Sequence, residues 1–239
     1  MPEKRRFAVL PRLGIAPTIK ETVVAALDGA ITERERDARG PIVVLDAGCG
    51  RQSALRHFRA RVTRLVGCDI HAPREPIAYL DEFAEIDVCG TADGWPDGTF
   101  DVVLSNFTLE HFAEPELAMR NFRRWLRPGG TFVATTVNRR HPFVRAYLDM
   151  PKRWRDRLQP AVKATAADAH PLVGACNDPA IIQRVLGEAG FQGIQLRTVG
   201  NLARAWGRNP VGYVLGLVGD LIAQPLASRR STILIIARA

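Results

Sequence analysis

Short apolar runs that alternate with helical patterns are the feature that most restricts the fold of this chain. Residues 42–46 begin with β-branched and aliphatic side chains, which is typical of a strand buried on both faces of a parallel sheet. The order of elements predicts a doubly wound, mainly parallel α/β sheet. We expect further strands at 64–68, 84–89, 100–105 and 131–137, and helices between them near 53–60 and 115–126.

The whole chain, residues 1–239, is expected to form a single domain. Its apolar residues, 46% of the total, are enough to bury one substantial core. We expect 1–40 to be a helical N-terminal cover and 42–137 to be the core that binds a ligand. Residues 138–177 and 201–230 lack strand periodicity and are expected to be insertions that shape the crevice for a second ligand.

The second half of the chain carries clear start and stop signals. Asp178 followed by Pro179 predicts the beginning of a helix over 178–189, which ends before Gly190. Strands are expected at 191–199 and 232–237. The four residues Arg127-Pro128-Gly129-Gly130 are interpreted as a breaker between the helix and the strand that precede and follow them.

Residues 211–223 are almost wholly apolar and are interrupted only by Asp220. A helix of this length rises only about 20 Å, too short for a hydrocarbon core of about 30 Å. We favour a helix that packs on the core or at a homodimer interface. A helix that lines an apolar pocket, or one that rests on a membrane surface, stays open as an alternative.

The chain is basic, with 33 Lys and Arg against 25 Asp and Glu, a formal charge of +8. We interpret the excess mainly as a solvated surface rich in arginine. An acidic small molecule, a nucleic acid or a membrane surface stays open as an anionic partner.

The four cysteines lack the paired spacing of a zinc site, and we expect no metal. We interpret them as reduced thiols of a cytoplasmic protein. The residues after Met1 do not resemble a secretory signal, so secretion is not expected.

A glycine loop follows the first strand and carries the main functional signal. Gly48 and Gly50 lack side chains, so the backbone there can turn sharply and approach a ligand closely. Asp69 ends the second strand, 19 residues after Gly50, where a carboxylate can accept both hydroxyl groups of a ribose. Together these residues predict a ligand that contains adenosine.

Two classes of ligand use such a loop, namely dinucleotides and S-adenosylmethionine. A dinucleotide site has a third glycine three residues after the second, where its pyrophosphate meets a helix N-terminus. Ser53 occupies that position here. S-adenosylmethionine has no phosphate, and its amine can be met by an acid before the glycines, which Asp46 supplies. The residues favour S-adenosylmethionine.

The chain resembles the class I S-adenosylmethionine-dependent methyltransferases, in particular their small-molecule branch of the methyltransferase type 11 kind. The resemblance implies a Rossmann-like sheet of seven strands, with the last strand, 232–237, antiparallel between the fifth and the sixth. It covers residues 43–137 and rests on five blocks in the family's order: Val44-Leu45-Asp46-Ala47-Gly48-Cys49-Gly50, Gly67-Cys68-Asp69-Ile70, Pro96-Asp97-Gly98-Thr99-Phe100-Asp101-Val102-Val103, Ser105-Asn106-Phe107-Thr108-Leu109-Glu110-His111 and Leu126-Arg127-Pro128-Gly129-Gly130.

The resemblance also implies a role for individual residues. Gly48 and Cys49 would lie against the methionine part of the cofactor and Asp69 on its ribose. Ile70 would contact the adenine ring, and Asn106 would lie near the ribose or the methionine backbone.

The family pattern changes after the third strand. Many members read Gly-Asp-Ala where this chain reads Gly90-Thr91-Ala92, with acids at Asp87 and Asp93. We assign the adenine amino group to Thr91 and Ala92. The product of the reaction would be S-adenosylhomocysteine.

Methyl transfer depends mostly on positioning of donor and acceptor and on exclusion of water. A general base is needed only for a poor nucleophile such as an alcohol. His111, which follows the fourth strand beside Glu110, is the first candidate for that base, and His141 is the second. Either histidine can instead have a purely structural role.

The leading hypothesis for the acceptor is a small molecule that is methylated on oxygen, as in a sugar, a glycolipid or a secondary metabolite. The apolar segment 211–223 and the basic stretch 152–157 suit an amphiphilic or acidic acceptor. Two alternatives stay open: an enzyme that modifies RNA or protein, and a binding subunit of methyltransferase type that has lost catalysis.

Overall fold

A computed structural model describes residues 17–37, 40–50, 53–90, 94–155, 157, 175–207 and 209–239. Thr91 and Ala92, the residues assigned to the adenine, lie outside the described residues. So do residues 156 and 158–174 of the insertion and residues 1–16 of the N-terminal cover.

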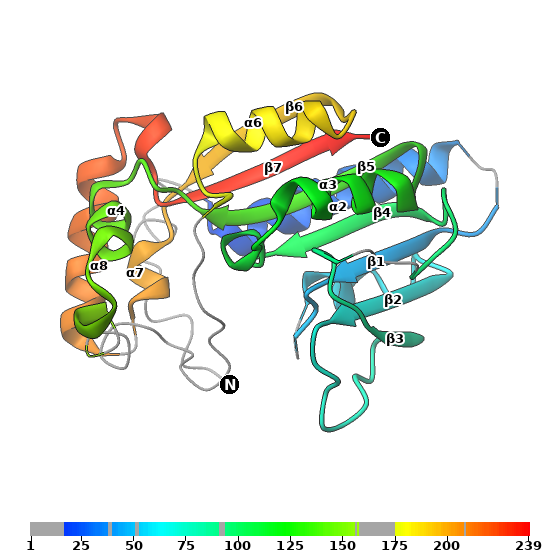
Figure 1. The fold of residues 1–239 in the computed structure, drawn as a ribbon, viewed down its shortest axis with the longest axis horizontal. Coiled ribbons are helices and arrows are strands. Elements are labelled where there is room, and N and C mark those ends of the chain that lie inside the picture. Colours follow the sequence, from blue (N-terminus) through cyan, green and yellow to red (C-terminus); the bar gives the residue numbers. More distant parts are fainter. Residues whose placement is uncertain are drawn as a thin grey trace.

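One twisted sheet of seven strands organises the molecule, in the order β3-β2-β1-β4-β5-β7-β6 (Figure 1). β7 pairs antiparallel with both β5 and β6, whereas the remaining pairs are parallel. The strands are β1 (Val43–Ala47), β2 (Arg64–Asp69), β3 (Glu82–Glu85), β4 (Phe100–Asn106), β5 (Leu126–Val137), β6 (Gln192–Val199) and β7 (Thr232–Arg238). The expected doubly wound sheet, and the place of its last strand, are confirmed.

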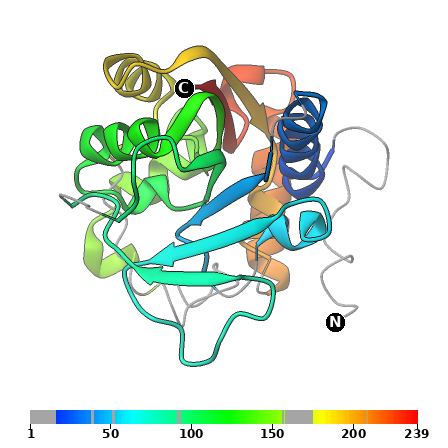
Figure 2. The ribbon, with the colours of Figure 1, turned by 90° about the vertical axis from the view of Figure 1, so that its right-hand side faces the viewer.

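Helices cover both faces of the sheet (Figure 2). α2 (Ile19–Arg36) covers one face, and its buried residues Leu27 and Ile31 pack into a core with Val44 and Leu65. α3 (Pro115–Trp125) and α6 (Pro179–Glu188) cover the other face. The expected start of the helix at 178–189 is confirmed, since Asp178 caps α6 by accepting from the Ala180 amide at 2.8 Å.

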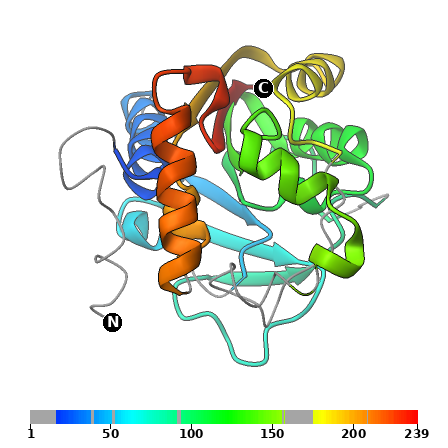
Figure 3. The same ribbon diagram turned by 90° about the vertical axis from the view of Figure 1, so that its left-hand side faces the viewer.

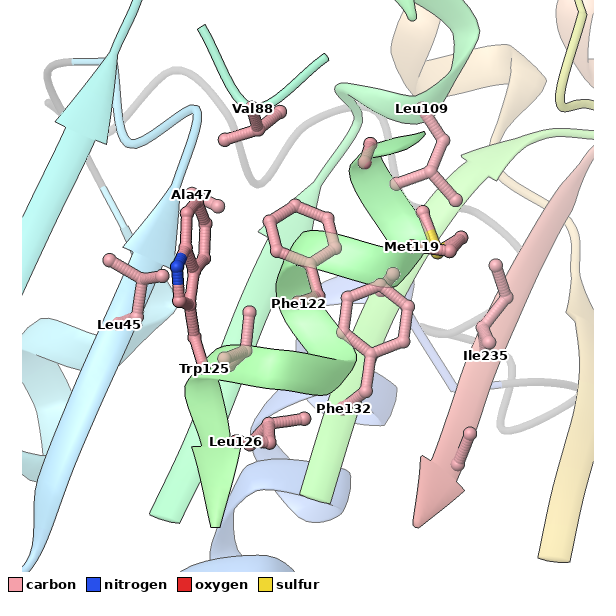
Figure 4. Packing of buried hydrophobic residues seen from close by; sticks show 14 of the residues in the cluster. Leu45, Ala47, Val88, Leu109, Met119, Phe122, Trp125, Leu126, Phe132 and Ile235 are labelled. Carbon is pink, nitrogen blue, oxygen red and sulfur yellow. The ribbon is translucent and has the colours of Figure 1, made fainter. Parts of the chain in front are cut away.

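The larger core is aromatic and lies under α3 (Figure 4). The rings of Phe122 and Phe132 stack with their centroids 5.3 Å apart, and Trp125 meets Trp95 edge to face at 5.0 Å. Such pairs stabilise a core beyond the area that they bury. This packing fixes β4 and β5, whose carboxyl ends form part of the site described below.

Three expected elements differ from the structure. The helix expected at 53–60 is a short 3-10 helix, η2 (Ala54–Phe58), because Leu55 and Phe58 are buried three residues apart, which suits a 3-10 repeat. The third strand ends at Glu85, since Asp87 turns the chain by accepting a hydrogen bond from the Cys89 amide. The breaker at 127–130 is the bulged beginning of β5, where Gly129 has φ +78°.

A cap of helices lies beyond the carboxyl ends of β1 and β4 (Figures 1 and 3). It contains α4 (Pro142–Asp149), α7 (Leu202–Ala205), α8 (Pro210–Ala223) and the 3-10 helix η4 (Ala227–Arg229). None of the helices in the described ranges is both long and apolar enough to cross a membrane. The expected insertions therefore contain helices, placed on the side of the sheet where ligands of such folds bind.

A buried carboxylate lies at the opposite, amino-terminal edge of the sheet. Asp101, at the beginning of β4, accepts a hydrogen bond from the Val43 amide at 2.8 Å. It also pairs with the guanidinium groups of Arg34 on α2 and Arg127 on β5, the latter at 3.0 Å. This carboxylate joins three strands and one helix.

Candidate functional site

The glycine loop at the end of β1 has the backbone conformation that only glycine adopts readily. Gly48 has φ +71° and Gly50 has φ +49°. A Cβ atom on Gly48 would overlap the methyl group of Thr108, whereas one on Gly50 would meet nothing within 4 Å. The Gly48 amide donates to the Cys68 carbonyl at 2.8 Å, which fixes the loop against β2. The loop is closely packed at Gly48 and has open space beside Gly50.

Asp69 joins the end of β2 to this loop. Its carboxylate accepts hydrogen bonds from the Gly50 amide at 3.2 Å and from the Ile70 amide at 2.8 Å. The side chain of Ile70 next to it is 41% exposed, although it is a large apolar group. An acceptor for ribose hydroxyls and an apolar surface for a base therefore adjoin the open side of the loop, where the sequence places them.

Asp46 is buried at the end of β1, with 2% of its surface exposed. Its Oδ2 atom accepts no hydrogen bond within the part of the chain that the structure describes. Burial raises the pKa of Asp46 to about 7, while a hydrogen bond from Ser53 opposes that rise. A buried acceptor without a donor is costly unless a ligand supplies one. Asp46 is thus suited to a cationic donor.

Tyr79, in the connection between β2 and β3, was not identified from the sequence. Its hydroxyl group is buried without a hydrogen-bond partner among the described residues. Burial raises its pKa, and the nearby charge of Asp46 adds to the rise. No motif surrounds Tyr79, so only the structure brings a second polar group to the end of β1.

The end of β4 places Asn106 next to β5. Its Oδ1 accepts a hydrogen bond from the Thr135 hydroxyl at 2.7 Å, and the Phe107 amide donates to the same Thr135 oxygen at 3.0 Å. Phe107 has φ +58°, the one positive value for a residue other than glycine in the described chain. Such strain collects at functional sites. Here it turns the chain away from the sheet directly after Asn106.

The thiols near the loop are protected. Cys49 is 4% exposed, and its amide donates to the Cys68 carbonyl at 3.1 Å. Burial raises the pKa of the Cys49 thiol to about 12 and also raises that of Cys68. Because a thiolate is the reactive form, these groups serve packing and not nucleophilic attack.

His111 and Glu110 lie on the 3-10 helix η3 (Leu109–His111), which follows β4. The imidazole of His111 is half-buried, and Glu110 is 4% exposed. The Glu110 carboxylate accepts a hydrogen bond from the Thr136 hydroxyl of β5 at 2.9 Å. A carboxylate and an imidazole are therefore adjacent in sequence and lie a few residues beyond Asn106.

His141 has a different environment. It is fully buried at the beginning of α4, where its Nδ1 atom accepts from the amides of Phe143 at 3.2 Å and Val144 at 3.4 Å. Its Nε2 atom lies 3.2 Å from the Gly219 carbonyl of α8, to which it donates in the matching tautomer. Burial lowers the pKa of His141. Both ring nitrogens are engaged, so His141 serves as a helix cap.

Asn177 is a second polar residue that the sequence did not single out. It is fully buried, and neither polar atom of its side chain has a partner among the described residues. Its main-chain carbonyl accepts a hydrogen bond from the amide of Arg139, just beyond the end of β5, at 2.9 Å. Burial raises the pKa of the neighbouring Cys176, and the charges of Glu116 and Glu110 raise it further. Asn177 therefore belongs to the same region as η3.

In the described ranges, no group of three or more His, Cys, Asp or Glu side chains is arranged to hold a metal ion. The site consists of glycine backbone, carboxylates, amides and an imidazole. A family model described as a methyltransferase domain matches residues 21–196, which is more than half of the chain. The chain belongs to this methyltransferase family.

Known methyltransferases are similar to the chain in sequence and in fold. It is 31% identical over 101 residues to malonyl-[acyl-carrier protein] O-methyltransferase of Pseudescherichia vulneris, a match that covers 41% of this chain and 40% of that relative. The chain thus spans less than half of that curated protein. A methyltransferase structure from Archaeoglobus fulgidus superposes with a TM-score of 0.53 at 16% identity, covering 92% of this chain and 94% of the other.

A second similar structure contains a relevant ligand. Phosphoethanolamine N-methyltransferase 2 of Haemonchus contortus, in complex with phosphomonomethylethanolamine and S-adenosylhomocysteine, has a TM-score of 0.52 at 15% identity, covering 89% of this chain and 52% of that protein. The chain thus belongs to the methyltransferase-domain family and has the fold of these S-adenosylmethionine-dependent enzymes. The acceptors of these relatives differ, one being named for oxygen and one for nitrogen.

The residues of this methyltransferase fit its cofactor. The unpartnered Oδ2 atom of Asp46 suits the cationic amine, the Asp69 carboxylate suits the ribose, and the space beside Gly50 suits close contact with the ligand. When bound, S-adenosylmethionine supplies an electrophilic methyl group on a sulfonium. The protein's own contribution is to hold the acceptor in line and to exclude water.

Proposed function

We propose that this methyltransferase acts on an oxygen atom of a small molecule, in the class of sugars, glycolipids or hydroxylated secondary metabolites. The observation that carries the proposal is the pair Glu110 and His111 on η3, a few residues beyond Asn106, which the family resemblance assigns to the cofactor. A hydroxyl group is a poor nucleophile, so its methylation gains from a base at that position. The O-methyltransferase relative supports the same acceptor atom.

In this proposal His111 accepts the proton of the acceptor hydroxyl as the new carbon–oxygen bond forms. Glu110, buried and held by Thr136, fixes η3 against β5 and so positions His111. His141 has no role in proton transfer, because its ring nitrogens are engaged. The expectation that it acts as a second candidate base is not retained.

We further propose that the cap, formed from residues in 138–177 and 201–230, binds the acceptor. Asn177 supports this role, since its buried amide can both donate to and accept from hydroxyl groups that enter the region. The basic side chains of α4 and its surroundings favour an acidic or amphiphilic acceptor over a neutral one. Loss of Asn177 would then weaken acceptor binding without a change in cofactor affinity.

Formation of S-adenosylhomocysteine, followed with a panel of hydroxylated and amino acceptors, tests the proposal. We expect turnover with hydroxyl acceptors. His111→Ala should lower kcat about 100-fold, the effect typical of a lost base, with no change in S-adenosylhomocysteine affinity. Turnover of amines alone, with His111→Ala fully active, would contradict an oxygen acceptor.

The same assay separates the alternatives. Methylation of RNA or protein substrates with no activity on small molecules would favour a modifying enzyme. Tight cofactor binding with no turnover of any class would favour a binding subunit. Calorimetry with NAD in place of S-adenosylmethionine serves as the control for ligand class, and no binding of NAD is expected.

We propose a cytoplasmic location on the state of the thiols. All four cysteines, Cys49, Cys68, Cys89 and Cys176, are free, and burial raises the pKa of each. Free, protected thiols are typical of proteins in a reducing compartment. Fractionation of cells that produce the full chain tests this location.

A further inference from the structure

The helix α8 is inverted relative to an ordinary amphipathic surface helix. Its inner face consists of glycines and one carboxylate, namely Gly212, Gly216, Gly219 and Asp220, with Ala223. The backbone of α7 lies so close that a Cβ atom on Gly216 would come within 2.6 Å of the Ala203 Cα atom. The small residues of α8 thus face the protein and allow the two helices to touch.

Asp220, the one Asp or Glu of α8, is buried and hydrogen-bonded inside the protein. It is 3% exposed, and its carboxylate accepts from the Ser231 hydroxyl and the Ala203 amide, both at 2.9 Å. The single charge that interrupts the apolar segment therefore does nothing for the solubility of the outer face.

The outer face of α8 is made of large aliphatic side chains. Their exposed fractions run from 41% to 69%, and apart from Ile70 and Trp154 they are the large exposed hydrophobic residues of the described chain. Burial of such side chains is favourable, and a patch of this kind marks a contact with an apolar phase or partner. The residues of this α8 patch are Val211, Val214, Leu215, Val218, Leu221 and Ile222, with Leu226 directly after the helix.

The α8 patch lies on the face of the molecule that the cap forms. α8 stands at the front of Figure 3 and at the left-hand edge of Figure 1, and α4 belongs to the same face. Trp154, 49% exposed, follows α4 with Arg157 over its ring at 5.6 Å. Amphipathic aromatic rings of this kind are favoured where water meets lipid.

The basic charge of the cap favours an anionic partner for the α8 patch. In the described parts of 138–157 and 200–231, the acids are Asp220, which is buried, and Asp149, which pairs with two arginines. The basic side chains greatly outnumber them: Arg139, Arg140, Arg145, Lys152, Arg153, Arg155, Arg157, Arg204, Arg229 and Arg230. Two copies that met through this face would bring like charges together, because a two-fold interface repeats the same surface.

We propose that the α8 patch docks the protein on an anionic lipid bilayer. A helix of 14 residues that is apolar outside and belongs to a cap rich in arginine is suited to lie in the plane of the interface, with its aliphatic side chains among the acyl chains. The basic side chains then meet the anionic headgroups. This docking surface goes beyond the proposed methyl transfer, and its test uses a different readout.

Sedimentation of the full chain with vesicles tests the proposal. We expect the protein to sediment with phosphatidylcholine vesicles that contain phosphatidylglycerol, and far less with pure phosphatidylcholine. High salt should weaken the binding, because it screens the charges. The double variant Leu215→Gln/Ile222→Gln should reduce the bound fraction about tenfold or more. The variant loses two aliphatic side chains that would be buried among the acyl chains of the bilayer.

The matched control is Leu215→Met/Ile222→Met, which keeps the same positions apolar and should retain binding. Both variants should bind S-adenosylhomocysteine as the unchanged protein does, which separates this test from the test of methyl transfer. Equal sedimentation of the Gln and Met variants, or no sedimentation with anionic vesicles, overturns the proposal. A dimer that the Gln variant abolishes, without vesicle binding, would instead identify a second copy as the occupant.

Discussion

At the scale of single residues, Asp46 is the carboxylate that we propose meets the amine of the cofactor, and the protein holds it in an unfavourable environment. Asp46 is buried, and its Oδ2 atom accepts no hydrogen bond from the described residues. Burial raises its pKa to about 7. In the cofactor-free protein this shift favours folding at low pH, and the contribution is lost as the pH rises through about 7. A bound ammonium group would reverse that preference.

We therefore predict that the affinity for S-adenosylhomocysteine rises as the pH increases toward about 7 and then levels off. Below that pH, binding should release a proton from Asp46. Calorimetry in two buffers with different ionisation enthalpies measures the proton release directly.

The variants for this prediction are Asp46→Asn and Asp69→Asn. Both variants should bind S-adenosylhomocysteine more weakly. Only Asp46→Asn should lose the pH dependence of binding, because it removes the carboxyl group whose pKa lies near 7. An unchanged pH profile in Asp46→Asn would show that another group titrates.

A second prediction separates the two histidines. His141→Ala should lower the free energy of unfolding by about 1–2 kcal/mol, because two amides at the beginning of α4 lose their cap. Cofactor affinity should not change. Urea unfolding of His141→Ala beside His111→Ala checks this, since the His111 variant is expected to lose turnover and little stability. Equal stabilities for the two variants would contradict the structural role of His141.

The positions of the residues that we assign to the cofactor were largely predictable from the sequence, because the ends of strands determine them. Gly48, Gly50 and Asp69 are tied to strand ends that the apolar pattern already marks. Tyr79 and Asn177 could not be found, since each lies in a connection without periodicity and matters only through its burial. The sequence does not distinguish His141 from His111, because the two histidines differ only in their surroundings in the folded protein.

At the scale of elements, α8 shows how a glycine can stabilise a helix that its propensity would weaken. Gly→Ala in a helix usually adds about 0.5–1 kcal/mol of stability. Gly216→Ala should do the opposite and lower stability by about 1–3 kcal/mol, because its new methyl group overlaps the α7 backbone. Gly29→Ala in α2 is the control, with nothing within 4 Å of its Cβ atom, and should stabilise the protein. Urea unfolding and amide exchange in α8 measure both effects; a stabilised Gly216→Ala would refute the close packing.

The elements themselves were predicted well where the pattern was long and poorly where tertiary contacts decide. The strands and α6 follow from apolar runs and cap residues. The pairing of Gly129 and Gly130 with Ala239 makes the expected breaker a part of β5, and no local rule indicates that. For 211–223 the sequence left several surroundings open, because an all-apolar helix has no face that its pattern singles out.

At the scale of the whole molecule, Asp101 joins α2, β1, β4 and β5 at the amino-terminal edge of the sheet. We predict that Asp101→Asn lowers the free energy of unfolding by about 3 kcal/mol, because it leaves two guanidinium groups without their buried partner. Asp97→Asn is the matched control, since the Asp97 side chain is 76% exposed and lies 3.3 Å from Arg124. Its effect should be below about 0.5 kcal/mol. Chemical denaturation of both variants measures the difference, and similar losses would contradict the role of Asp101.

The residues that join the strands thus lie at the amino-terminal ends of the strands, and the residues proposed to bind ligands lie at their carboxyl ends. Asp101 and its partners hold the strands together at one edge, while Asp46, Asp69, Asn106 and the cap lie at the other. Substitutions in the cap leave the ties at the far edge untouched, so descendants of one ancestor are free to exchange acceptors while they inherit the same donor site and the same fold. Divergence of this chain from its relatives is expected to concentrate in the cap, and two homologues with the same glycine loop need not share a substrate.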